Sequence, residues 1–536
     1  MARYGAARGT ARIGMVVAAG LLATACSVSP EPLTLQERRD QVAADRARLF
    51  VDQEPLTGPV TLAEAMARAI KYNLDYRQAM MEELLQAKQL DVTTYDMLPK
   101  LAASAGYTAR DKPNESLSRN TITNFQSLEP AVSQDKNRTT ADLGFTWNLL
   151  DLGVSWFQAH QQADRVLIAQ ERKRRLINSI IQQVRGAYWL AVSSERLQGE
   201  IAPILAEARK ALEEAKLVED ERLKPPLEAL RFQKALLELI RQLETVQQDL
   251  AISKAQLAAL MNVPLGQNFT LAYPAGFNQE IPKVEVPIET METVALLNRP
   301  EMREEQYQKR INAAEVRKAM VRMLPGISFN TSFNYDSNSY LIHNMWAEAG
   351  ARLTLNLFNI VSGPAAIRAA EAQQDAGDFR RLALSMATLT QVHVAYQQFM
   401  RGRTNFEQAR TLESIERRIN ENVQQAATAE GESPLERIRA KASAVNAQLA
   451  RDRAYAELQT ALSSLYVSLG LDPLPETVPS HDIKGLTEAL ARVTADWQNG
   501  RITIDPPPVT PVAGPAPAPT PDGTPVAAAA PAGPAS

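Results

Sequence analysis

The chain has 536 residues but only one cysteine, Cys26, and four scattered histidines. A single cysteine excludes an internal disulfide and a Cys-based metal site. No histidine lies beside another at the spacing that metal ligands need. A glycine-rich phosphate loop and a nucleophile elbow are also absent from the sequence. We therefore expect no metal, no cofactor and no enzymatic activity.

Strong net charge and long apolar runs are missing as well. The net charge is −3 and the pI is about 6.0, so the chain has no electrostatic footprint for binding nucleic acid. The mean hydropathy is −0.25, and no uninterrupted apolar run reaches the roughly 18 residues of a transmembrane helix. Any membrane span should then be built from strands.

The N-terminus has the composition of a secretory signal. Three arginines precede the apolar stretch 13–25, which is too short to cross a bilayer as a helix. The stretch ends in small residues before Cys26 and resembles a bacterial lipobox, although Ala23 stands where such boxes usually have Leu. We expect a signal peptide at 1–25 and lipidation of Cys26, and Ser27 favours the outer membrane by resemblance to known lipoproteins. An ordinary signal peptide is the alternative, and it also predicts export.

Two parts of the chain match each other. A shift of 226 places aligns Met-Leu-Pro at 97–99 with the same tripeptide at 323–325, and a shift of 208 aligns Pro226 with Pro434. The difference between the shifts, 18 residues, is extra length in the first copy between its two strands. This pattern predicts a tandem duplication of one helix–strand–strand–helix unit.

The remaining segments surround these two copies. The end of the chain is rich in Pro and Ala and cannot bury enough apolar surface to fold. We expect the following organisation after the signal peptide: an N-terminal linker at 26–60, a first repeat at 61–264, an inter-repeat linker at 265–292, a second repeat at 293–473, a C-terminal periplasmic segment at 474–504 and a disordered tail at 505–536.

Very long helices are predicted at 154–219 and 365–429, which are rich in Ala, Gln, Arg, Glu and Leu. A helix of this length spans about 100 Å. The helix that returns in the first copy keeps a seven-residue register, which implies a left-handed coiled coil. In the second copy this register breaks at Arg451. One seam position of the first copy is filled by Ala229, Leu236, Leu243, Leu250 and Leu257, and its partner position by Phe232, Leu239, Val246, Ser253 and Leu260.

Four segments alternate between apolar and polar residues with the period of a strand: 100–107, 142–149, 327–335 and 352–357. Strands of about 9 to 11 residues can cross a bilayer when tilted, with apolar residues outside and polar residues inside. Asn148 and Asn356 are then expected as hydrophilic lining.

Four strands leave two open edges, and an open edge cannot lie in hydrocarbon. Other copies of the chain must therefore close the sheet. Two copies would give an eight-stranded barrel filled by side chains, whereas three would give twelve strands and a lumen. A small sheet packed on the helices of a soluble protein is the alternative.

In this order, the features resemble the TolC family of outer-membrane efflux and secretion ducts. The resemblance covers Thr61 to Pro473 and rests on the repeat, on the Leu-Pro junctions before the strands, on Thr-x-Asn-Leu at Thr146 and Thr354, and on the Pro-Leu-Glu segments that begin the return helices. It implies a mainly α fold with a transmembrane β-barrel contribution. A long coiled-coil α-barrel would continue a trimeric, twelve-stranded barrel to which each protomer gives four strands.

The resemblance also implies a function and partners. The homotrimer would be the passive outer-membrane channel of a tripartite efflux or type I secretion system in a Gram-negative bacterium. It would be lipid-anchored in the outer membrane and would meet a periplasmic adaptor protein and an inner-membrane pump through its periplasmic tunnel. The alternative function is a lipid-anchored periplasmic coiled-coil adaptor or scaffold.

Members of this family narrow the tunnel at the helix hairpins, often with two acidic residues after each turn. Glu228 and Glu436 match the first acidic position, but Arg231 and Arg439 stand where the second is often found. We hypothesise that a Glu–Arg network between neighbouring hairpins holds the resting state closed. The turn residues are expected either to contact the adaptor or to be solvated, and they are Glu221, Arg222, Lys224, Glu430, Gly431, Glu432 and Ser433.

Overall fold

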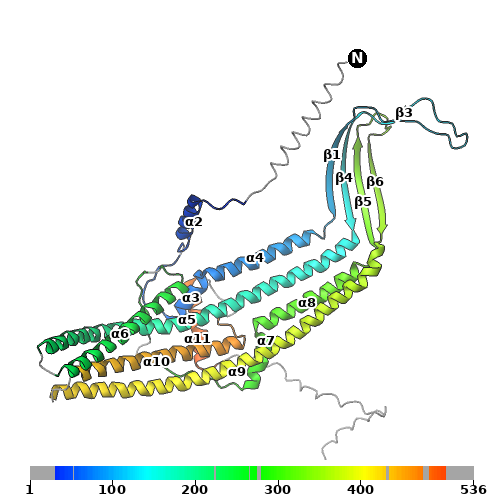
Figure 1. Cartoon of the computed structure of the whole chain (residues 1–536). Helices are drawn as coiled ribbons and strands as arrows, with labels where there is room; N and C mark the ends of the chain where they lie inside the picture. Colours follow the sequence, from blue (N-terminus) through cyan, green and yellow to red (C-terminus); the bar gives the residue numbers. More distant parts are fainter. Residues whose placement is uncertain are drawn as a thin grey trace, which may run out of the picture.

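The protein is an elongated body of long helices that continues at one end into a sheet of strands (Figure 1). The computed structural model describes residues 30–51, 53–221, 225–264, 266–273, 279–429, 434–474 and 482–501. The expected signal peptide, Cys26 and the Pro- and Ala-rich tail lie outside these described residues.

The element order confirms the tandem repeat. The first copy consists of α3 (Leu62–Tyr72), α4 (Leu74–Tyr95), β1 (Lys100–Ala109), β4 (Asn137–Asn148), α5 (Leu149–Asp220) and α6 (Pro226–Leu260). The second consists of α7 (Ile288–Asn298), α8 (Pro300–Val321), β5 (Gly326–Asp336), β6 (Met345–Thr354), α9 (Leu357–Ala429) and α10 (Pro434–Ser468). Adding 226 to the bounds of α3 and α4 gives α7 and α8, and adding 208 to those of α6 gives α10.

Four further elements lie outside this scheme. They are α2 (Leu35–Arg48), α11 (Ile483–Gln498), and the short strands β2 (Glu115–Ser116) and β3 (Ala131–Val132). The pair β2–β3 is antiparallel and belongs to the longer loop of the first copy, between β1 and β4.

The two long helices begin earlier than the sequence predicts, and α5 and α9 contain 72 and 73 residues. At 1.5 Å per residue each spans about 110 Å. Their starts are set by asparagines: Asn148 Oδ1 accepts a hydrogen bond from the Leu150 N–H at 2.9 Å, and Asn356 Oδ1 accepts one from Phe358 at 3.1 Å. Asn148 and Asn356 are therefore helix caps, and their role as pore lining stays a prediction.

The long helices form a single layer. Near the sheet the order is α4, α5, α8 and α9, and toward the hairpin turns it is α6, α5, α10 and α9 (Figure 1). Helix α4 buries none of its residues because it lies at an edge of the layer. None of the described helices combines the length and the apolar character that a membrane span needs.

The core has two parts. At mid-body, α3, α11 and the segments beside them pack on α5 and α10 and bury residues such as Met66, Tyr188 and Leu490. Toward the hairpin turns, a second cluster lies between the long helices themselves. The five residues predicted at the first seam position are all buried, as the heptad register predicts. At the partner position Val246 and Ser253 are buried, and Phe232, Leu239 and Leu260 are half-buried.

The four long strands form one antiparallel sheet in the order β1-β4-β5-β6, so β1 and β6 are its edges. Strand β6 starts at Met345, not at Arg352, and Leu357 already belongs to α9. The first half of β6 contains Ala347, Glu348, Ala349 and Gly350, whose weak alternation hides it in the sequence; pairing with β5 fixes it as a strand.

Candidate functional site

The helix hairpins carry the residues expected at the tunnel aperture. Helix α6 begins at Pro226 and α10 at Pro434, and proline suits the first turn of a helix because its missing N–H would have no partner there. Glu221 follows the last residue of α5 as its C-cap and is exposed. The other expected contact residues lie outside the described residues: Arg222, Lys224, Glu430, Gly431, Glu432 and Ser433.

The structure places the four aperture residues on the first turns of the return helices. Glu228 and Arg231 are exposed on α6, and Glu436 and Arg439 are exposed on α10. Arg439 pairs with Glu436 at 3.2 Å within its own helix. An exposed pair one turn apart contributes little to stability, so both side chains are available to new partners. A network between hairpins stays a prediction.

A buried charge cluster joins α5 and α10 at mid-body, and it was not predicted from the sequence. Asp452 on α10 is 1% exposed. Its carboxylate accepts hydrogen bonds from Ser193 Oγ at 2.9 Å and from Arg196 at 2.5 Å on α5, and from Gln279 at 3.1 Å in the inter-repeat segment. Arg451, the residue at which the seam breaks, pairs with the same carboxylate at 2.8 Å. The break in the heptad register at Arg451 was the sequence feature that could have indicated this cluster.

A buried arginine lies close to this cluster on α5. Arg185 donates to Gln459 Oε1 at 2.8 Å, and Gln498 of α11 donates to the same oxygen at 2.9 Å. Burial lowers the pKa of Arg185 to about 10. Burial raises the pKa of Tyr455 and Tyr466 to about 12, although the Arg185 charge opposes this shift. These groups fix α11 against α5 and α10.

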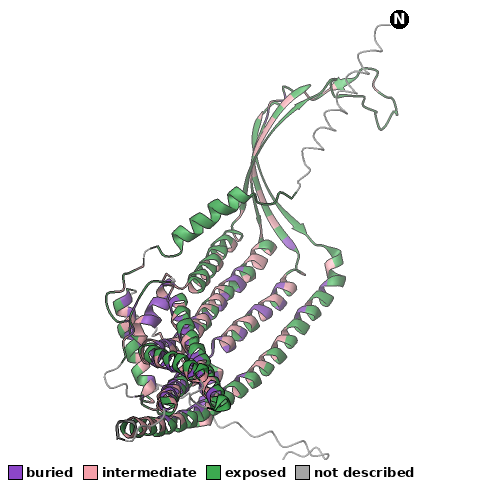
Figure 2. Ribbon diagram, turned by 60° about the vertical axis from the view of Figure 1, so that its left-hand side comes forward, coloured by how far each residue is buried: buried purple, intermediate pink, exposed green. Residues whose placement is uncertain are grey.

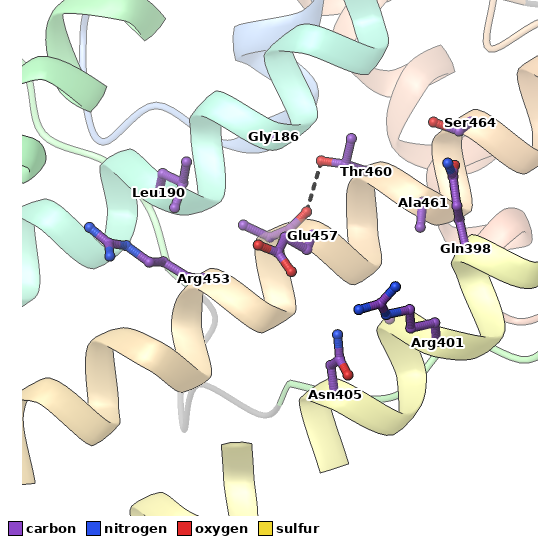
Figure 3. Close-up of a pocket in the computed structure, with 12 residues that line it drawn as sticks. Gly186, Leu190, Gln398, Arg401, Asn405, Arg453, Glu457, Thr460, Ala461 and Ser464 are labelled. Carbon is purple, nitrogen blue, oxygen red and sulfur yellow. Dashed lines mark hydrogen bonds between the residues drawn. The ribbon is translucent and has the colours of Figure 1, made fainter. Parts of the chain in front are cut away.

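The opposite face of the helical layer is hollowed by a groove of about 550 Å³ between α5, α10 and α9 (Figure 3). Two glycines allow the helices to approach closely there. A Cβ atom at Gly186 would lie 2.9 Å from Thr460 Oγ1, and one at Gly402 would lie 3.5 Å from the Cα of Leu458. Figure 3 shows Arg401 on α9 and Glu457 on α10 beside this groove.

The sheet exposes its apolar face. In β5 the residues Phe329 and Phe333 are exposed, whereas Ser332 and Asn334 on the other face are half-buried. The strands extend beyond the helices instead of packing on them (Figure 1), and Figure 2 shows them as mostly exposed or intermediate. The alternative of a small sheet packed on the helices is therefore wrong, because the apolar face of this sheet is not covered by them (Figure 1).

Metal ligands do not gather in the part of the chain that the structure describes. There, no three His, Cys, Asp or Glu side chains form a group that could hold an ion.

Comparison with known proteins identifies the fold. No protein family and no curated protein matches the chain by sequence. Solved structures do match. The open state of the Neisseria gonorrhoeae MtrE outer membrane channel aligns with a TM-score of 0.60 at 18% identity, over 76% of this chain and 89% of that one. The chain has the TolC-like fold of outer-membrane channels.

Two further channels support the same conclusion. The Campylobacter jejuni CmeC outer membrane channel aligns with a TM-score of 0.59 at 14% identity, over 82% of this chain and 94% of its own length. The outer membrane protein VceC of Vibrio cholerae aligns at 0.56 and 14%, over 77% and 96%. The expected fold class, a long helical body that continues into strands, is confirmed. The structures that share it are described as channels or membrane proteins, not as enzymes.

Proposed function

We propose that this chain is one protomer of a homotrimeric outer-membrane channel, which serves as the passive export duct of a tripartite efflux or type I secretion system. The exposed apolar face of the four-stranded sheet is the observation that carries the proposal. Phe333 is 63% exposed in the isolated chain and Met345 is 73% exposed. Such a face is stable in lipid, and the polar face with Ser332 and Asn334 would then line a wet interior.

The two open edges of the sheet support assembly from several copies. Strands β1 and β6 each leave one row of backbone N–H and C=O groups unpaired within the chain. Lipid offers these groups no hydrogen-bond partner, so β1 of one copy must pair with β6 of the next. Three copies give twelve strands, which is enough for a lumen.

The proposal includes a location and partners. A lipidated Cys26 would anchor the chain in the outer membrane of a Gram-negative bacterium, and the helices would extend through the periplasm. The hairpin turns near Glu221 and at 430–433 would meet a periplasmic adaptor protein, and an inner-membrane pump would supply the energy for transport. Glu228, Arg231, Glu436 and Arg439 would narrow the periplasmic end.

Purification of the full chain from outer membranes tests the assembly. We expect a ring-shaped particle in detergent with three times the mass of the mature chain, and ion conductance after insertion into planar bilayers. A monomer that leaves the membrane without detergent would contradict the channel and would support a lipid-anchored scaffold.

The role of the aperture residues has its own test. Arg439 pairs with Glu436 of its own helix and would link neighbouring hairpins in the hypothesised network, so we expect Arg439→Ala to give a larger single-channel conductance. Lys234→Ala is the matched control, since Lys234 pairs with Glu238 of the same helix at 3.7 Å and both are exposed. Conductance unchanged by Arg439→Ala would remove the gating role and leave the channel proposal intact.

A further inference from the structure

The two faces of the helical layer differ. Helices α3 and α11 cover one face at mid-body: Tyr188 on α5 donates to the Val60 carbonyl at 3.1 Å, and Tyr466 on α10 donates to the Trp497 carbonyl at 2.9 Å. Neighbouring residues of a helix are about 100° apart. Gly186 and Leu190, two positions away from Tyr188, therefore lie on the opposite, uncovered face of α5.

Two grooves share this uncovered face. The first, of about 550 Å³, contains Gly186 and Leu190. The second, of about 800 Å³, lies closer to the sheet between α4, α5 and α8. Leu176 and Ser179 line it from α5, and Ser179 precedes Gly186 by two helical turns. The grooves therefore follow each other along one face of the same helix.

The lining of the two grooves is basic, although the chain as a whole carries a net charge of −3. Only two carboxylates line them, those of Glu82 and Glu457. They face six basic side chains, which are Arg165, Arg172, Lys173, Arg175, Arg401 and Arg453.

Neighbouring carboxylates compensate half of these cations. Arg172 pairs with Glu304 at 2.6 Å, Lys173 with Glu83 at 2.5 Å and Arg453 with Asp249 at 2.8 Å.

The charges of the other three arginines are not compensated by a carboxylate of the described residues. Arg165 donates to the neutral amide oxygen of Gln162 at 3.0 Å. Arg175 and Arg401 make no hydrogen bond or ion pair with any other residue in the described ranges. All three are exposed on the uncovered face.

Apolar side chains lie beside these three guanidinium groups. Leu85, Ile168 and Leu176 line the second groove, and Leu190 and Ala461 line the first. A guanidinium group binds carboxylate, sulfonate or phosphate oxygens through paired N–H donors. Together these surfaces suit a ligand with an apolar body and an anionic group.

We propose that this arginine-lined face is a binding track for amphipathic organic anions, and that such anions are the cargo of the duct. This inference rests on the proposed function, because closure of three protomers with α3 and α11 outside turns the uncovered face toward the lumen. Charge of one sign in a confined passage raises the local concentration of oppositely charged solutes. The track would thus attract anionic cargo without a closed, high-affinity site.

Calorimetric titration of the purified full-length assembly in a neutral maltoside detergent tests the track. The probes are naphthalene-2-sulfonate, neutral 2-naphthol and the cationic naphthalen-2-ylmethylammonium, each corrected for uptake by detergent alone. The sulfonate should bind most tightly. The triple variant Arg165→Gln, Arg175→Gln, Arg401→Gln should raise its Kd about tenfold or more, since charged hydrogen bonds are lost.

Two further variants make the result specific. The triple variant Arg38→Gln, Arg39→Gln, Arg46→Gln removes the same charge from α2, which buries none of its residues, and should change the Kd by less than about twofold. Replacement of the three groove arginines by Lys should keep most of the binding. Equal affinity for the sulfonate and the neutral naphthol, or an unchanged Kd in the groove variant, would overturn the proposal.

Reversal potentials measured in a KCl gradient distinguish a failure of this inference from a failure of the proposed channel. A conducting pore that prefers chloride, and shifts toward potassium in the groove variant, supports the track. A conducting pore whose selectivity the groove variant does not change contradicts it. Absence of any conductance would instead count against the proposed channel, while the titration would still decide whether the groove binds anions.

Discussion

Two asparagines at equivalent positions of the repeats show how a single side chain sets an element boundary. Replacing Asn148 or Asn356 with Ala removes the oxygen that accepts from the N–H two residues later. We expect each substitution to lower the free energy of unfolding by about 1 kcal/mol, as for other N-caps. Urea unfolding followed by circular dichroism measures the loss, and Asn148→Asp, which keeps an acceptor, should be nearly neutral. A loss of conductance without a loss of stability would support the predicted lining role.

The buried tyrosines predict how stability depends on alkaline pH. Burial raises the pKa of Tyr466 to about 12, whereas a tyrosine in the unfolded chain ionises near pH 10. Between these values the folded state holds a proton that the unfolded state has lost. The stability that this tyrosine contributes is therefore complete below about pH 10 and is lost as the pH rises toward 12.

Tyr466→Phe removes this titrating group. We expect unfolding free energy to fall less steeply with pH between about 10 and 12. At pH 7 the variant should lose about 1 kcal/mol, because the Trp497 carbonyl no longer receives its 2.9 Å hydrogen bond. Denaturant unfolding across this pH range measures both effects. Tyr95→Phe is the control, since Tyr95 is 70% exposed, and an identical pH slope in the two variants would contradict the assignment.

For single residues, the sequence predicted the chemical character of a side chain better than its structural role. Alternation placed Asn148 on the polar face of a strand, and the same residue type also favours the position before a helix. A period-two pattern cannot show where the strand stops. Asp452 was missed for a different reason: apart from the adjacent Arg451, its donors come from α5 and from the inter-repeat segment, for example 256 and 173 positions away in the sequence.

One pair of seam positions is apolar in the first helix hairpin and charged in the second. The first repeat has Leu205 on α5 and Leu243 on α6, both buried in the cluster near the hairpin turn. At the positions 208 residues later, the second repeat has Glu413 and Arg451, whose charged groups are 3.6 Å apart and almost completely covered. A covered ion pair regains little of its desolvation cost. The second hairpin is therefore held less firmly than the first.

Restoring the apolar seam should stabilise the second hairpin. We expect the double variant Glu413→Leu, Arg451→Leu to raise the free energy of unfolding of α9 and α10 by only about 1 kcal/mol, because the buried Asp452 loses Arg451 but keeps Arg196. Glu413→Leu alone should lower this free energy of unfolding, because Arg451 loses one of its carboxylate partners. Hydrogen exchange of the amides near the two hairpin turns measures the change, with the first hairpin as internal control. Faster exchange in the double variant would show that the ion pair stabilises the hairpin.

The sequence predicted elements well where one repeat supported the other. Heptad spacing identified α6, and the shifts located its counterpart α10. The short helices α3 and α7 were not predicted, because 11 residues each are too few for several periods of a pattern. Strand β6 was placed too late, since its ends depend on pairing with β5 and not on its own residues.

The long helices and the sheet form one layer with two unlike edges. Strand β1 and helix α4 form one edge, and β6 and α9 form the other (Figure 1). Both helical edges expose large apolar side chains: Met81 and Leu84 on α4, and Phe379 and Met386 on α9. In the proposed assembly one edge of a chain contacts the other edge of the next, and such head-to-tail contacts form a ring where the rotation closes.

This geometry predicts how defective chains combine. One double variant, Met81→Glu, Leu84→Glu, should disrupt the contact at the α4 edge. The other, Phe379→Glu, Met386→Glu, should disrupt the contact at the α9 edge. Each places charge in an apolar contact. Either variant alone should remain a monomer in detergent. A mixture retains one intact contact, so it should form pairs with one chain of each kind and no closed trimer. Light scattering with correction for detergent measures these masses. If one of the variants paired with itself, the contact would join like edges, and a ring of three could not form.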